Sequence, residues 1–201
     1  NNDNKYWLGL FDCTGHGVPG AFITMVLLSG IQRIETQNHK ITPVVLLKMI
    51  DEYLLEIFQT EEDKFASSGA EGAIVCFNND KKSISFAGAK RPLWVQDKNG
   101  KVSEIKSQRR ILGQIPKIDA WEEKEISIDN ISRIFLFSDG ITDEGNMESF
   151  SFGKERLEEL LGSNIKTSID SIPNIISRSL KKWRDGAQQR DDQTLISLQL
   201  P

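Results

Sequence analysis

Acidic side chains stand at the ends of three short apolar runs. In chain order they are Asp12, Asp139 and the pair Asp191-Asp192. If the last apolar run is a strand antiparallel to the first two, these carboxylates gather at one edge of a sheet. Clustered carboxylates repel one another unless a cation neutralises them, and an oxygen-only ligand set favours Mg²⁺ or Mn²⁺ over Zn²⁺. The pattern therefore predicts metal-assisted hydrolysis of a phosphoester by activated water. The alternative is that each Asp only forms a turn or caps a helix.

A loop with three glycines, residues 13–20, follows the first of these aspartates. His16 is a candidate proton donor to the leaving oxygen, and the alternative is that it only orders the loop. A cysteine-phosphatase mechanism is excluded because Pro19 stands where that mechanism needs Arg after Cys13. Nucleotide binding by a P-loop is also disfavoured, since no Lys and Ser/Thr follow Gly20.

The elements that must position these residues alternate between strands and helices. The expected strands are 6–11, 73–77, 83–87, 92–95, 102–105, 121–128, 134–137 and 194–200, and the expected helices are 21–37, 43–58, 152–161 and 169–183. Two helices followed by many strands and then by helices and a last strand predict an α+β fold, with two packed sheets and helices outside. The chain has no repeat and no linker, so residues 1–201 are expected to form one domain.

Composition restricts the partners and the compartment. The 201 residues carry 25 Lys and Arg against 29 Asp and Glu, a net charge of −4, which argues against a nucleic-acid partner. Two isolated cysteines without a CxxC motif favour a reducing, cytoplasmic setting. The longest apolar stretch, 21–31, is shorter than a membrane span. We therefore expect no direct membrane insertion of this segment.

Several segments together resemble one family. Residues 12–21 (DCTGHGVPGA) resemble the DxxGHGxxA segment of the SpoIIE-type bacterial protein phosphatases, a branch of the metal-dependent PP2C superfamily. Further similar segments, in family order, are 87–93 (AGAKRPL), 111–113 (ILG), 137–143 (FSDGITD), 152–157 (FGKERL) and 190–194 (RDDQT). The ordered set covers nearly the whole chain.

The resemblance implies a PP2C-like αββα sandwich of two antiparallel sheets flanked by helices. It also implies a protein serine/threonine phosphatase with two Mn²⁺ or Mg²⁺ ions and water as the nucleophile. Asp12 would bridge the ions, the backbone carbonyl of Cys13 would ligate one, and Asp139 and Asp191 would ligate the second. The implied substrate is a phosphoserine or phosphothreonine on an anti-anti-sigma (STAS) type regulator. The implied setting is an output domain behind a sensor, through which the whole protein could be membrane-tethered.

One departure from the family affects the expected activity. The family has an upstream strand whose GD(F/Y)xD segment supplies a further metal-binding Asp, and this sequence begins after that point. Asp3 falls in the expected turn and is not counted as a replacement. We therefore expect these residues to bind metal weakly and hydrolyse slowly. The alternative is a catalytically silent partner-binding module of the same fold, and a third option is a hydrolase of small phosphoesters.

Three further features have open alternatives. The basic cluster of Lys106, Arg109 and Arg110 is expected to be a solvated loop, or else a docking patch for a phosphopeptide. The apolar stripe of helix 43–58 is expected in the core, and its alternative is a homodimer or sensor-coupling surface. Three further acidic residues are expected to be loop residues, with a metal or water contact as the alternative. They are Asp143, Glu144 and Asp192.

Overall fold

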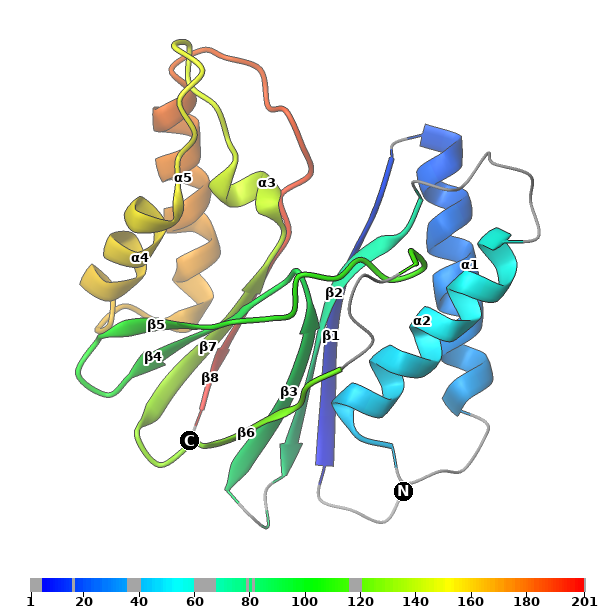
Figure 1. Ribbon diagram of the computed structural model, residues 1–201. Helices are drawn as coiled ribbons and strands as arrows, with labels where there is room; N and C mark the ends of the chain where they lie inside the picture. Colours follow the sequence, from blue (N-terminus) through cyan, green and yellow to red (C-terminus); the bar gives the residue numbers. More distant parts are fainter. Residues whose placement is uncertain are drawn as a thin grey trace. The chain divides into compact units, whose positions relative to one another are not determined.

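The computed structural model describes residues 5–15, 17–35, 41–59, 68–78, 80, 82–115 and 121–200. Contacts divide the chain into two units (Figure 1). The first unit comprises Asn1–Pro92 and Lys106–Ser127, and the second comprises Leu93–Ile105 and Ile128–Pro201. The expectation of a single domain stays a prediction.

The first unit contains an antiparallel sheet of four strands in the order β1-β2-β3-β6. Its elements are β1 (Lys5–Cys13), α1 (Gly17–Glu35), α2 (Pro43–Gln59), β2 (Ala70–Asn78), β3 (Ser83–Ala89) and β6 (Lys124–Ser127). The helices α1 and α2 lie side by side, and α2 packs on β2 and β3 (Figure 1).

The core of the first unit lies between these two helices and the sheet. On α2, Leu47, Ile50 and Leu54 recur at helical spacing and are fully buried, because this spacing places them on one helix face. They pack with Ile23 of α1 and Ile74 of β2. The predicted apolar stripe of this helix is therefore core, as expected.

The second unit contains another antiparallel sheet, in the order β5-β4-β7-β8. Its elements are β4 (Leu93–Asp97), β5 (Val102–Ile105), β7 (Ile131–Phe137), α3 (Asp139–Thr142), α4 (Lys154–Ser163), the 3₁₀ turn Ile169–Ser171, α5 (Ile172–Arg184) and β8 (Leu195–Gln199). In Figure 1, α4 and α5 lie side by side. Leu157, Ile176 and Leu180 on these helices pack against Phe135 of β7 and Trp94 of β4.

Two sequence expectations about the strands are wrong in detail. Asp12 does not follow its strand but lies within β1, because the backbone continues to pair with β2 as far as Cys13. The three acidic segments also do not share one sheet edge. Asp12 lies in the first sheet, whereas Asp139 and Asp191 flank strands of the second. A single sequence shows which segments are strands but not which strands are neighbours.

The helix α1 also differs from expectation. The stretch Gly17–Ile34 is long and apolar enough to cross a membrane by length and composition, with a mean hydropathy of 1.3. The apolar stretch 21–31 is only part of this window, because the helix begins at Gly17 and continues past Gln32 and Arg33. In the first unit, this helix contributes Ile23, Leu27 and Ile34 to the core, and a core helix of a folded domain meets the same criterion.

Candidate metal centre

The Asp139 turn and the Asp191-Asp192 segment are neighbours in the second unit. Asp139 is the first residue of α3, and Ser138 alone separates it from β7. The Ser138 hydroxyl donates to the backbone carbonyl of Asp192 at 2.9 Å and accepts from the backbone N–H of Thr194 at 3.0 Å. The N–H of Ser138 donates to the carbonyl of Thr194 at 3.1 Å. The antiparallel pairing of β7 with β8 therefore continues past the strands and brings two predicted metal-ligand segments together.

Gly140 makes this close approach possible. A Cβ atom at this position would lie 2.2 Å from the backbone oxygen of Asp192, far inside ordinary contact distance. The backbone of the Asp191-Asp192 segment thus occupies the space that a side chain would need. The SDG sequence has a structural reason here, since only glycine leaves room for the second acidic segment.

The first unit holds the other predicted ligands, Asp12 and Cys13. Asp12 stands opposite Glu71 in the pairing of β1 with β2. Like charges opposite each other in a sheet are destabilising, and Arg91 offsets them. Its Nη2 lies 2.7 Å from Asp12 Oδ2 and 3.1 Å from Glu71 Oε2. Lys90 adds a contact of 3.1 Å to Glu71 Oε1.

The glycine-rich loop after Asp12 is held tightly. The Thr14 hydroxyl donates to the carbonyl of Gly69 at 3.0 Å and accepts from its N–H at 2.8 Å. A Cβ at Gly20, in the first turn of α1, would lie 2.6 Å from the carbonyl oxygen of Gly15, so the loop can approach the start of the helix only because residue 20 is glycine. Burial raises the pKa of the Cys13 thiol, which keeps this thiol neutral near pH 7 and agrees with the exclusion of a cysteine nucleophile.

The predicted ligands fit a hard divalent cation in the chemistry of their donor atoms. Every proposed donor atom is a carboxylate or carbonyl oxygen, the type that Mg²⁺ and Mn²⁺ prefer. Gly140 leaves the space that lets two acidic segments approach. Within the described ranges, no three His, Cys, Asp or Glu side chains form a ready cation-binding group. The joint action of Asp12 with Asp139 and Asp191 stays a prediction, and His16 lies outside the described residues.

The predicted basic cluster is not a uniform solvated loop. Arg110 is largely buried and forms an ion pair with the buried Asp51 of α2. Its guanidinium also lies 4.5 Å from the ring centre of Trp121. The Asp51 carboxylate accepts a further hydrogen bond of 2.8 Å from the backbone N–H of Gly113. The docking alternative therefore cannot use Arg110, which instead ties the loop to α2.

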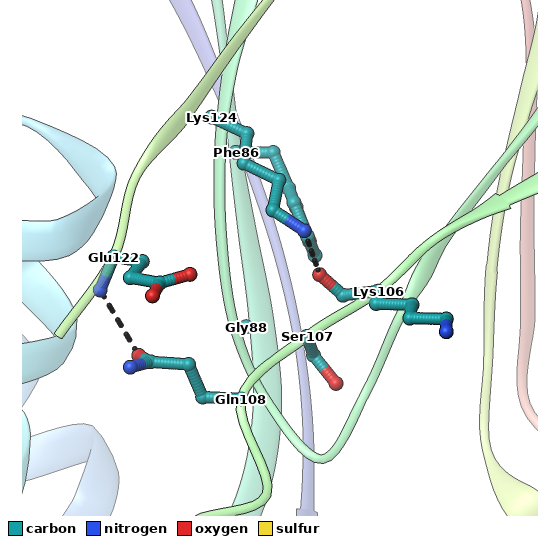
Figure 2. Close-up of a pocket in the computed structure, with 7 residues that line it drawn as sticks. All are labelled: Phe86, Gly88, Lys106, Ser107, Gln108, Glu122 and Lys124. Carbon is teal, nitrogen blue, oxygen red and sulfur yellow. Dashed lines mark hydrogen bonds between the residues drawn. The ribbon is translucent and has the colours of Figure 1, made fainter.

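A small pocket lies beside this loop (Figure 2). Its volume is about 10 Å³, which is room for about one water molecule. The ammonium of Lys124 donates to the carbonyl of Lys106 at 2.7 Å, while the side chain of Lys106 points away from the pocket (Figure 2). The pocket is too small for a substrate phosphate and contributes no binding site to this centre.

Comparisons with known proteins agree with the ordered motifs. The family model described as Stage II sporulation protein E (SpoIIE) matches residues 2–201. The chain belongs to the SpoIIE family. It is 26% identical over 202 residues to phosphoserine phosphatase RsbP of Bacillus subtilis, covering 97% of this chain. The chain spans 46% of that relative's length, less than half.

Solved structures show that this SpoIIE-family chain has the PP2C fold. The SiaA-PP2C domain of Pseudomonas aeruginosa superposes with a TM-score of 0.85 at 24% identity, covering 100% of this chain and 77% of the other. RsbX, solved in complex with magnesium, superposes with a TM-score of 0.59 at 13% identity, covering 98% and 82%. The expected α+β fold of two antiparallel sheets with helices is confirmed.

Sequence reasoning missed several residues that support the predicted ligands. The family resemblance of residues 87–93 assigns no role to Arg91, whose Nη2 donates to Asp12 Oδ2 at 2.7 Å. Glu71 has no motif signal, because only the register of β1 on β2 places it opposite Asp12. Glu144 is expected from the sequence to be a loop residue, with a metal or water contact as the alternative, whereas its side chain is fully buried beside Arg184. A buried carboxylate in a polar loop carries no periodic signal that a sequence could show.

Proposed function

We propose that this chain is a metal-dependent phosphatase domain that hydrolyses phosphoserine or phosphothreonine on a regulatory protein. The observation that supports it most is the contact of the Asp139 turn with the Asp191-Asp192 segment through Ser138. Family membership and the phosphoserine phosphatase among its relatives agree with this reaction. The substrate that the family resemblance suggests is a STAS-type regulator.

The residues have separate tasks in this proposal. Asp12, the carbonyl of Cys13, Asp139 and Asp191 would hold two Mn²⁺ or Mg²⁺ ions. When bound, such ions lower the pKa of a water molecule and neutralise the phosphate. Arg91 forms ion pairs with Asp12 and with Glu71 on the adjacent strand, and so offsets the repulsion between these two carboxylates. A relative of this fold has been solved with magnesium, which supports the choice of metal.

The test is phosphate release from a phosphoserine peptide and from p-nitrophenyl phosphate. We expect release with Mn²⁺, loss with EDTA, and loss in Asp139→Asn and Asp191→Asn. Asp170→Asn is the matched control, because Asp170 is exposed in the same unit and outside the predicted site. Release that neither EDTA nor the Asp139 change affects would refute the proposal. Binding of a partner protein with no release at all would favour the silent module, and preference for nucleotides would favour a small-molecule hydrolase.

A further inference from the structure

Two glutamine residues flank Asp191 in the sequence, and each contacts one member of the ion pair between Arg184 and Glu144. Before it, Gln189 donates from Nε2 to the backbone carbonyl of Asp191 at 2.8 Å. After it, Gln193 donates from Nε2 to Glu144 Oε2. Arg184 at the end of α5 donates from Nη1 to Gln189 Oε1 at 3.1 Å and lies 3.8 Å from Glu144 Oε2. The backbone of Asp191 is thus linked to Glu144 from both sides.

The Glu144 carboxylate is buried without full compensation for the loss of its contacts with water. Its side chain is 0% exposed, and Arg184 is 21% exposed. The second carboxylate oxygen, Oε1, has no hydrogen-bond partner. Removing a carboxylate from water costs several kcal/mol unless its contacts compensate. If residue 144 only filled this space, an apolar side chain would stabilise the protein more than a carboxylate does. The buried charge of Glu144 therefore indicates a role other than packing.

The elements joined by Glu144 supply that reason. Glu144 follows α3, which begins at Asp139, while Gln189 and Gln193 belong to the segment between α5 and β8. That segment has no strand or helix of its own to fix Asp191. The segment is also held at Asp192, whose carbonyl accepts from the Ser138 hydroxyl at 2.9 Å, whereas Asp191 Oδ1 accepts locally, from the N–H of Asp192 at 2.7 Å.

We propose that Glu144 is a positioning residue, which together with Arg184 fixes the Asp191 segment for cation binding. This inference rests on the proposed function, because it takes Asp191 as a metal ligand. Groups that orient metal ligands from outside typically change metal affinity about 10–100-fold when they are replaced. Glu144 itself touches neither metal nor substrate in this proposal.

The experiment measures Mn²⁺ binding directly, by isothermal titration calorimetry and by the electron paramagnetic resonance of free Mn²⁺. Glu144→Met removes both links of the carboxylate, and Glu144→Gln keeps an acceptor for Gln193. Gln189→Leu cuts the link from Arg184 to Asp191 at an exposed side chain, so this variant is expected to fold. Glu148→Gln is the control, because Glu148 is exposed in the same loop.

We expect Glu144→Met and Gln189→Leu to weaken Mn²⁺ binding about 10-fold, with a smaller loss in Glu144→Gln and none in Glu148→Gln. A purely structural role would lower the unfolding temperature and leave the affinity unchanged well below that temperature. Wild-type affinity in Gln189→Leu and in folded Glu144→Met would overturn the inference alone. If Glu144→Met does not fold, Gln189→Leu decides. Absence of Mn²⁺ binding by the unmodified chain would instead overturn the proposed function.

Discussion

Gly140→Ala tests whether the closeness of the two acidic segments matters for activity. The added Cβ would lie 2.2 Å from the backbone oxygen of Asp192 and 3.0 Å from its carbonyl carbon. An ordinary carbon-to-oxygen contact is about 3.3 Å, so the Asp192 backbone must move by about 1 Å. No side chain can rotate away, because the obstructing atoms are backbone.

The magnitude follows from this displacement. A shift of about 1 Å in a catalytic group can lower the rate about 100-fold, and overpacking costs about 1–3 kcal/mol of stability. We therefore expect Gly140→Ala to hydrolyse p-nitrophenyl phosphate about 100-fold more slowly than the unmodified chain when Mn²⁺ is present. It is also expected to unfold at a lower urea concentration than the unmodified chain.

The matched control is Gly162→Ala in α4. A Cβ there would meet only the backbone oxygen of Gly100, at 3.4 Å, which is ordinary contact. Replacing a helical glycine by alanine stabilises by about 1 kcal/mol, so this variant should be more stable and equally active. A Gly140→Ala variant with the rate and Mn²⁺ affinity of the unmodified chain would refute the reasoning.

Three further predictions concern the two units separately. Burial raises the pKa of Asp51 in the folded first unit, so folding there binds an extra proton and stability falls as pH rises through that pKa. Asp51→Asn should remove this part of the pH dependence, which urea unfolding between about pH 4 and about pH 7 would reveal; an unchanged dependence would contradict it. Burial likewise raises the pKa of Cys13, so alkylation by iodoacetamide near pH 8 should be slower than that of glutathione, and a faster reaction would be contrary evidence. Leu157→Ala in the fully buried core of the second unit should cost about 2–5 kcal/mol in urea unfolding, while Leu160→Ala at a half-buried position should cost less. Equal losses for the two leucines would show that burial does not decide the cost.

Local periodicity and turn residues determined the elements of this protein. The helical spacing of Leu47, Ile50 and Leu54 was enough to predict α2 and its buried face, because residues three and four apart in a helix lie on one face whatever that face packs against. The runs that became β7 and β8 were equally clear. The motifs in family order also indicated the PP2C fold, which the comparison with solved structures confirmed.

Pairing between distant segments was decided only by the tertiary structure. The assignment of β1 and β7 to different sheets, the position of Glu71 opposite Asp12 and the passage of Asp192 over Gly140 depend on which backbones meet. The ion pairs of Arg91 with Asp12 and of Glu144 with Arg184 likewise join residues far apart in the sequence. The types and the sequence spacing of these residues do not predict such contacts. The strand register and the burial of side chains in the folded chain bring their atoms together.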